Sequence, residues 1–194
     1  MIAQIANAVS EDDCRVLTAI CDREAPLTTI RDYTGHPVLY WERLPCAREI
    51  VSRLVKDCLR NIATKLHLVD PLYPETVLLT VLGVAGYHSR HADNCRQNEK
   101  GEWVANHTSQ RDVTAIYYLN DEFEGGEILF HHQRLLVKPS RGLLLAFPSD
   151  AEHEHEVHAV RSGLRYTMPI WFTRQLRFAL ADFSPGALAN SGDR

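Results

Sequence analysis

The sequence predicts an α+β fold in which two amphipathic helices precede short strands that close into a double-sheet jelly roll. Three observations support this prediction. Two segments in the first third of the 194 residues repeat apolar side chains at helical spacing. From residue 75 onward, short β-rich segments alternate with turn residues. No change in composition divides the chain, so we expect one domain over residues 1–183.

The two helices are expected over about residues 10–66. The first begins after Ser10, an N-cap residue followed by acidic side chains in the first turn. Its apolar positions are Cys14, Leu17, Ile20 and Cys21. The second covers residues 47–66, and its apolar face consists of Ile50, Leu54, Val55, Cys58, Leu59, Ile62 and Leu66. Because each helix has one apolar face, we expect both to pack on one outer face of the strands.

Seven strands are expected in the jelly-roll core, which covers about residues 75–175. They are residues 75–84, 112–119, 127–130, 134–138, 142–147, 156–160 and 165–172. The polar segment 94–111 is long for a loop in a compact domain, which predicts a lid or substrate loop. The tail, residues 184–194, is rich in Gly, Ala, Ser and Asn and is expected to be disordered.

Composition argues against several classes of protein. The formal net charge is −4 and no basic stripe is present, so we expect no nucleic-acid partner. No apolar segment is long enough for a transmembrane helix, and no basic region followed by an apolar one opens the chain, so we expect a cytoplasmic protein without a membrane partner. The five cysteines include no Cys-x-x-Cys pair, which predicts reduced thiols rather than disulfides or a zinc site.

A metal-ligating pattern begins at His91 and Asp93. Residues two apart in an extended segment point to the same face, so both can bind one ion. A third ligand must come from a distant strand, and His155 fits because it lies beside a segment that reads as strand; His153 and His158 are alternatives. Two imidazoles and one carboxylate with open positions form the facial set that binds non-haem Fe(II). The sequence therefore predicts an iron site.

Arg165 begins the last expected strand. A guanidinium among apolar strand residues is costly unless it meets an anion, and its planar fork suits a carboxylate. A dicarboxylate co-substrate that binds the iron at one end would leave its far carboxylate for Arg165. Thr167 lies on the same strand face and is a candidate for a further hydrogen bond to that carboxylate, with a packed threonine as the alternative.

Several stretches together resemble a known family. They are His91-Ala92-Asp93-Asn94-Cys95, the segment 111–127 with its Tyr-Tyr-Leu-Asn run, Lys138-Pro139-Ser140-Arg141-Gly142, and residues 155–173. In order and spacing they are similar to the catalytic domain of the leprecan-type prolyl 3-hydroxylases and, more broadly, to the prolyl-hydroxylase-like Fe(II)/2-oxoglutarate-dependent dioxygenases. The resemblance covers roughly residues 75–175.

The resemblance implies a cupin-like double-stranded β-helix that binds Fe(II) through His91, Asp93 and His155. The separation of ten positions from His155 to Arg165 matches the family's spacing and favours His155 as the third ligand. Arg165 would bind the distal carboxylate of 2-oxoglutarate. Tyr118 would donate a hydrogen bond to the same carboxylate, with an ordinary core aromatic as the alternative.

One family position is missing. A tyrosine is common nine or ten residues before the first ligand histidine, where this chain has Val81 and Leu82, and Tyr87 is the candidate substitute.

The implied reaction couples decarboxylation of 2-oxoglutarate, with O2 as oxidant and ascorbate as a candidate reductant, to hydroxylation of a C–H bond. Asp93 favours hydroxylation over halogenation, because related halogenases have a small residue at that position. The implied substrate is a prolyl residue in a peptide or protein, and collagen is not expected because the cysteine-rich loop of the animal enzymes is absent. A free amino acid or a small natural-product intermediate is the alternative substrate. From a different class, a non-catalytic metal-binding jelly roll is a third hypothesis, and Arg165 argues against it.

Overall fold

The computed structural model describes residues 1–68 and 70–183, and the predicted disordered tail at 184–194 lies outside these residues. Within this part of the chain, two α-helices and fourteen strands form, and all strand pairs are antiparallel. The α+β class is therefore confirmed. None of the helices described is both long and apolar enough to span a bilayer.

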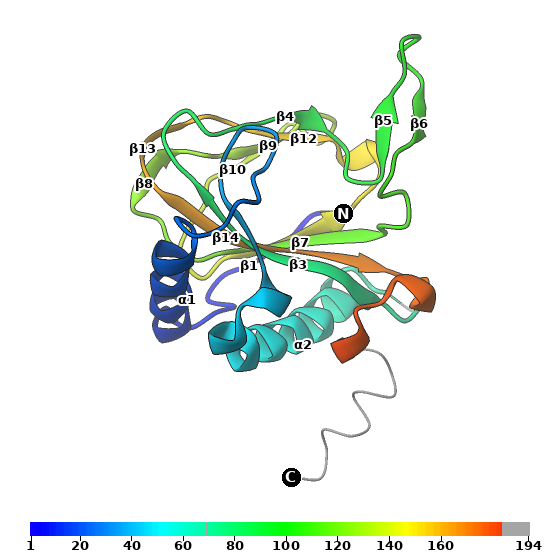
Figure 1. Cartoon of the computed structure of the whole chain (residues 1–194). Coiled ribbons are helices and arrows are strands. Elements are labelled where there is room, and N and C mark those ends of the chain that lie inside the picture. The colour runs from blue at the N-terminus through cyan, green and yellow to red at the C-terminus, as the bar shows by residue number, and fades with distance from the viewer. Residues whose placement is uncertain (69, 184–194) are drawn as a thin grey trace.

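The larger sheet has six strands in the order β1-β11-β7-β14-β3-β2. These strands are β1 (Ala3–Ile5), β11 (Leu144–Pro148), β7 (Val113–Tyr118), β14 (Arg165–Thr173), β3 (Tyr73–Leu82) and β2 (Val38–Tyr40). In Figure 1, helices α1 (Glu11–Glu24) and α2 (Arg48–Lys65) lie below this sheet and cover one of its faces. Both helices are thus on one outer face, as predicted.

The smaller sheet has four strands in the order β10-β9-β12-β4 and lies above the other face of the larger sheet (Figure 1). Its strands are β10 (Leu135–Val137), β9 (Ile128–Phe130), β12 (His155–Val157) and β4 (His88–His91). Two strand pairs complete the structure, namely β8 (Phe123–Gly125) with β13 (Val160–Gly163), and β5 (Cys95–Gln97) with β6 (Trp103–Ala105). The β5–β6 hairpin stands away from the body, beside the space between the sheets (Figure 1).

The helices form where the apolar spacing predicts them. The Ser10 hydroxyl accepts a hydrogen bond from the Asp13 amide at 3.1 Å, which caps α1. The predicted apolar side of α1 is buried as a whole. In α2 the buried face is Val51, Leu54, Val55, Cys58 and Ile62, whereas the predicted Ile50, Leu59 and Leu66 pack at its border. The apolar stripe is therefore narrower than expected and includes Val51.

Two apolar clusters occupy the two sides of the larger sheet. One lies between the helices and the sheet, and the other lies between the two sheets. Strand alternation sorts neighbouring residues between them, because Tyr117 belongs to the helix side and Tyr118 to the inner side. The inner side is the one that contains the candidate site.

The segment 94–111 differs from the predicted loop because it contains the β5–β6 hairpin. The Asn98 side chain accepts hydrogen bonds from the amides of Lys100 and Glu102, and Gly101 has φ of 77°, so local turn chemistry builds the hairpin tip. The expected strand 156–160 is also interrupted, since β12 ends at Val157 and β13 begins at Val160. Strands of three or four residues, such as β1, β2, β4, β8 and β13, are too short to show alternation in the sequence.

Candidate metal centre and its cavity

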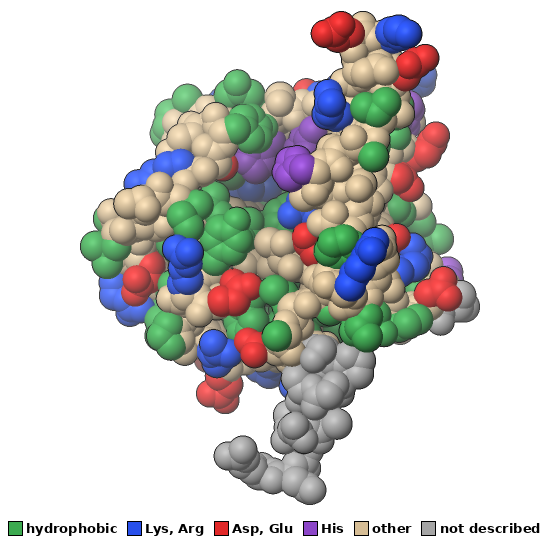
Figure 2. Space-filling view, turned by 45° about the vertical axis from the view of Figure 1, so that its right-hand side comes forward, with side chains coloured by type: hydrophobic (Ala, Val, Ile, Leu, Met, Phe, Trp, Pro, Cys, Tyr) green, Lys and Arg blue, Asp and Glu red, His purple; other side chains and the backbone are tan. Residues whose placement is uncertain are grey.

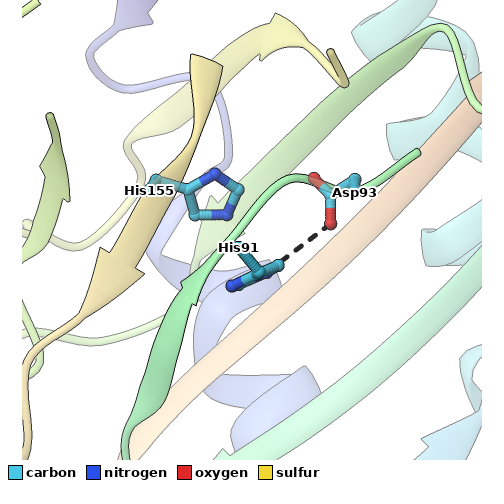
Figure 3. A group of neighbouring side chains, drawn as sticks. All are labelled: His91, Asp93 and His155. Atoms are coloured by element: carbon cyan, nitrogen blue, oxygen red, sulfur yellow. Dashed lines mark ion pairs between the residues drawn. The ribbon is translucent and has the colours of Figure 1, made fainter. Parts of the chain in front are cut away.

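Two adjacent strands of the smaller sheet place the two candidate histidines side by side. His91 ends β4 and His155 begins β12, and the two residues are direct partners in the antiparallel ladder. Their ring centroids lie 4.4 Å apart. Asp93 follows β4 by two residues, and the ligand atoms of all three side chains lie within 4.8 Å of one another (Figure 3). The structure thus brings the predicted ligand set together.

Backbone carbonyls fix the orientation of both imidazoles. His91 Nδ1 lies 2.7 Å from the Ser89 carbonyl oxygen, and His155 Nδ1 lies 3.0 Å from the His153 carbonyl oxygen. Because a carbonyl oxygen only accepts, each Nδ1 carries the proton and each Nε2 keeps its lone pair for a metal. Burial also lowers the pKa of His155 to about 4, which keeps this imidazole in the neutral form that binds metals.

Asp93 is buried and held at both its side chain and its backbone. The Thr114 hydroxyl donates to Asp93 Oδ2 at 2.6 Å, and the Thr108 hydroxyl donates to the Asp93 carbonyl oxygen at 2.8 Å. Burial by itself raises the pKa of Asp93, but the imidazoles of His155 and His91, together with the Thr114 hydroxyl, outweigh it and lower that pKa. Asp93 therefore offers an ionised carboxylate, which is the form that binds a cation.

Arg165 and Tyr118 form a second polar group in the inner space. Arg165 is only 2% exposed, and its Nε donates to the Gly126 carbonyl oxygen at 3.2 Å. Its Cζ atom lies 5.0 Å from the centroid of the Tyr118 ring. Tyr118 is fully buried, which raises its pKa, and its hydroxyl has no hydrogen-bond partner among the described residues. A buried guanidinium beside a buried, unpartnered hydroxyl fits a ligand carboxylate that would accept from both.

One cavity of about 500 Å³ joins the three candidate ligands with Arg165, whereas Tyr118 lies behind Arg165 and does not itself line the cavity. The three candidate ligands, Arg165 and Thr167 line it, together with apolar side chains that include Ile116, Ile128, Val157 and Leu78. Figure 2 shows a hollow on this face of the molecule with histidine side chains at its centre, beside the projecting hairpin. The volume and the mainly apolar wall with a few convergent polar groups are typical of small-molecule sites. The donor set suits Fe(II), and the Arg165 group suits a dicarboxylate.

The remaining predicted residues fall in different places. Thr167 lines the cavity, and its hydroxyl shares a hydrogen bond of 2.7 Å with that of Thr80. Tyr87 does not line the cavity, because it lies just after the turn from β3 to β4 and is 47% exposed. The structure therefore does not place Tyr87 where it could replace the missing family tyrosine. His88, the residue after Tyr87, does line the cavity, and so does Tyr33 from the segment between α1 and β2.

The other histidines of the His153 to His158 segment serve elsewhere. His153 lies in a single 3-10 turn, where its Nδ1 is 2.6 Å from Asp150 Oδ1. His158 Nδ1 lies 3.6 Å from Glu127 Oε2. Of the three histidines considered from the sequence, His155 alone joins the His91 and Asp93 group in the described part of the chain.

Several residues of the site carry no signal in the sequence. Thr114 and Ser149 are close only because β7 pairs with β11, and their hydroxyl oxygens are 2.8 Å apart. Tyr33 reaches the site from the segment between α1 and β2, where its hydroxyl accepts a hydrogen bond of 2.8 Å from the Ser89 amide. The Arg111 guanidinium lies over the Trp171 ring, 4.1 Å from its centroid, and both residues line the cavity. A sequence pattern cannot reveal such pairs before the strand register is known.

Several known proteins are similar to this chain in sequence or in fold. Human prolyl 3-hydroxylase 2 is 27% identical over 203 aligned residues, which cover 86% of this chain but 28% of that protein. The chain therefore spans a little over a quarter of this relative's length.

Two solved structures show the same fold at low identity. A viral collagen prolyl hydroxylase from Paramecium Bursaria Chlorella virus-1, solved as a 2OG complex, has a TM-score of 0.69 at 19% identity and covers 89% of this chain and 94% of its own. A Trichoplax adhaerens prolyl hydroxylase, solved with a hypoxia inducible factor peptide fragment, has a TM-score of 0.60 at 18% identity, with coverage of 99% and 87%.

The sequence profile of the 2OG-Fe(II) oxygenase superfamily matches residues 77–173. This match extends from β3 to the end of β14, so it contains His91, Asp93, His155, Arg165 and Tyr118. The family that the motifs indicated is confirmed: the chain belongs to the 2OG-Fe(II) oxygenase superfamily.

Proposed function

We propose that this chain is an Fe(II)- and 2-oxoglutarate-dependent hydroxylase that acts on a prolyl residue in a peptide or protein. One observation carries the proposal. A ligand set of two histidines and one aspartate shares a single cavity with Arg165, a buried guanidinium whose one hydrogen bond within the described chain is to a backbone carbonyl. We also propose that the two facing sheets form the double-stranded β-helix that the sequence predicts.

His91, Asp93 and His155 would hold Fe(II), and Arg165 would bind the distal carboxylate of 2-oxoglutarate with Tyr118 as a further donor. When bound together, Fe(II), 2-oxoglutarate and O2 supply oxidative decarboxylation coupled to hydroxylation of a C–H bond. The protein's own residues bind and orient the reactants. The carbonyl-anchored imidazoles keep their Nε2 atoms on the metal side, and the fork of Arg165 fixes the direction of the dicarboxylate.

The wall of the cavity would keep water away from the reacting C–H bond. Ile116, Ile128 and Val157 belong to the apolar cluster between the sheets, and they line the cavity beside the polar groups. A dry wall strengthens the attraction between Arg165 and a carboxylate, because the local dielectric is low.

A peptide substrate is supported by the relatives and by the shape of the entrance. The relatives are prolyl hydroxylases by name, and one was solved with a peptide fragment. The projecting β5–β6 hairpin lies beside the hollow (Figure 2). Cys95 and Arg96 of this hairpin line the cavity together with Tyr33, so an extended chain would find contacts from both segments. Peptide or protein is therefore the proposed partner, and Fe(II), 2-oxoglutarate and O2 are the proposed cofactor and co-substrates.

The experiment that tests this proposal is succinate formation by the purified protein with Fe(II), ascorbate and 2-oxoglutarate. A panel of proline-containing peptides is compared with a panel of free amino acids, and Asp93→Ala serves as the blank. We expect peptides to stimulate succinate formation and to gain the mass of one oxygen atom.

Each other outcome has a definite meaning. Stimulation by a free amino acid alone would replace the peptide by a small molecule and keep the reaction. If neither panel raises succinate above the Asp93→Ala blank, and 2-oxoglutarate does not bind the metal-loaded protein, the non-catalytic metal-binding hypothesis would take the place of the enzyme.

A further inference from the structure

We propose that Thr114 and Ser149 are positioning residues that fix Asp93 as a one-oxygen metal ligand through Oδ1. This inference rests on the proposed function, because it assigns a role to two hydroxyl groups that act through the candidate ligand. Neither residue is predicted by the sequence motifs. Both are buried, with 2% of Thr114 and 1% of Ser149 exposed.

The direction of the two hydrogen bonds follows from proton counting. An ionised carboxylate can only accept, so Thr114 must give its single hydroxyl proton to Asp93 Oδ2 across 2.6 Å. Thr114 then has only lone pairs left for its contact of 2.8 Å with Ser149, and Ser149 must be the donor. The chain Ser149 to Thr114 to Asp93 is therefore polarised toward the carboxylate, which makes the last hydrogen bond stronger than a neutral one.

The two carboxylate oxygens of Asp93 have different neighbours as a result. Oδ2 is engaged by Thr114, whereas Oδ1 lies 3.8 Å from His91 Nε2, on the side where the ligand atoms converge. Rotating the carboxylate to present Oδ2 to a metal would break the Thr114 hydrogen bond in a buried environment, where an unmade hydrogen bond is costly. Oδ1 is thus the ligand oxygen that the hydroxyl pair leaves free.

Thr114, which contacts Asp93 directly, comes from a more regular element than the residue it holds. Thr114 lies in β7, which pairs on both sides, with Phe147 of β11 and with Trp171 of β14. Asp93 lies outside any strand, after the edge strand β4. Without outside contacts, its side chain would depend on a short connecting segment. The hydroxyl pair ties it instead to the centre of the six-stranded sheet.

The experiment measures metal binding directly, without turnover. Mn(II) affinity is determined by calorimetric titration for the wild type, Thr114→Val, Thr114→Ser and Ser149→Ala, with the absorption spectrum of the Co(II)-loaded protein as a second readout of the ligand set. Thr173→Val is the matched control, because Thr173 is a buried strand threonine whose hydroxyl accepts from the Gln175 amide and does not line the cavity. Thermal unfolding of the metal-free variants reports structural damage.

We expect Thr114→Val to weaken Mn(II) binding about 10–100-fold, the usual effect of losing a group that orients a metal ligand, and to change the Co(II) spectrum. Thr114→Ser should restore affinity to within about 3-fold of the wild type, and Ser149→Ala should cause a smaller loss than Thr114→Val, since the direct contact to Asp93 survives. Thr173→Val should leave both readouts unchanged.

Wild-type affinity in a folded Thr114→Val variant, or an equal loss in Thr173→Val, would overturn the inference. If Thr114→Val does not fold, the inference stands or falls on Ser149→Ala, whose unaltered Mn(II) affinity and Co(II) spectrum would refute it. Failure of the proposed function gives a different result, because the wild type would then form no succinate above the Asp93→Ala blank whatever the Mn(II) affinities are. Failure of the metal site itself would show as a wild type that binds Mn(II) no better than Asp93→Ala.

Discussion

Tyr117 and Tyr118 are neighbours in β7, both are fully buried, and they differ in what their hydroxyl groups find. Tyr117 points to the helix side, where its hydroxyl donates to the Leu54 carbonyl oxygen at 3.1 Å. Tyr118 points to the inner side, where its hydroxyl has no partner among the described residues. An unpartnered buried hydroxyl costs about 1–3 kcal/mol, and beside the Arg165 guanidinium a ligand carboxylate would supply the missing acceptor.

The same contrast holds for the two faces of the larger sheet as a whole. The helix face is filled by apolar side chains from the sheet and the two helices, and the Tyr117 hydroxyl on this side donates to the Leu54 carbonyl oxygen of α2. The inner face carries ionisable and hydroxyl groups around a cavity of about 500 Å³. The helix face therefore stabilises the fold by itself, and the inner face is completed by a ligand. Substitutions on the two faces should separate stability from binding.

The largest effect on binding is expected from Arg165→Ala. Removing one partner of a buried, hydrogen-bonded charge pair costs about 2–5 kcal/mol, so 2-oxoglutarate affinity of the Mn(II)-loaded protein should fall by that amount while Mn(II) affinity is retained. Calorimetric titration measures both. Arg174→Ala is the control, since Arg174 donates to Asp112 at a half-exposed position outside the cavity. Undiminished 2-oxoglutarate binding by Arg165→Ala would remove the main support for the proposed co-substrate.

Leu54→Ala should lower stability and leave ligand binding unchanged, which is the opposite of the result expected for Arg165→Ala. Leu54 is 1% exposed in the apolar cluster between helices and sheet, and deleting such a side chain lowers the free energy of unfolding by about 2–5 kcal/mol. Urea unfolding measures this loss, and the folded variant should bind Mn(II) and 2-oxoglutarate as the wild type does. Leu136→Ala, at a position that is 53% exposed, should change stability by less than about 0.5 kcal/mol. A comparable loss of ligand affinity in Leu54→Ala would show that the two faces are coupled.

The tyrosine pair gives the sharpest form of the comparison. Tyr117→Phe should lower the free energy of unfolding by about 1 kcal/mol, because it leaves the Leu54 carbonyl oxygen without this donor. The same variant should bind 2-oxoglutarate with the affinity of the wild type. Tyr118→Phe should cost no stability, because its hydroxyl is unpartnered in the described chain, and should weaken 2-oxoglutarate binding by about 1.5–3 kcal/mol. Identical behaviour of the two variants in both measurements would contradict the assignment of Tyr118 to the co-substrate.

The smallest effect concerns Gly126, whose carbonyl accepts from Arg165. Gly126 has φ of +65°, and a Cβ built there would lie 2.7 Å from Arg165 Cδ. Gly101 has φ of +77° with nothing within 4 Å, so Gly101→Ala carries a similar backbone penalty of about 1 kcal/mol without the contact. We expect Gly126→Ala to weaken 2-oxoglutarate binding several-fold more than Gly101→Ala, as measured by titration. Equal affinities would mean that Arg165 adapts freely to the displacement.

The parts of this molecule that the sequence predicts are those whose pattern lies within one segment of the chain or repeats along it. The apolar spacing of Cys14, Leu17, Ile20 and Cys21 and the cap at Ser10 lie within one segment, and the first helix formed where they indicated. His91 and Asp93 likewise belong to one short motif. His155 and Arg165 were assigned by family spacing, and the structure places both in the cavity with the motif.

The parts that the sequence does not predict depend on pairing between distant strands. Thr114 contacts Ser149 only because of the register of β7 and β11. Tyr33, which precedes β2, contacts Ser89 of β4, more than fifty positions further along the chain. Tyr87, the candidate substitute for the family tyrosine missing at Val81 and Leu82, lies close to His91 in sequence but is exposed and does not line the cavity. The three-residue strands of the β5–β6 hairpin were hidden for a simpler reason, since a segment so short has no measurable period.

The base and the tip of the β5–β6 hairpin depend on different contacts. Its base is tied to Asp93, whose carbonyl oxygen accepts from Asn106 and Thr108 at 3.3 and 2.8 Å. Its tip at Asn98 to Gly101 is shaped by its own turn contacts. Insertions, deletions or grafted sequences at the tip would therefore leave the ligand geometry in place. The tip can therefore vary in sequence, as surface loops do, without disturbing the contacts that hold Asp93.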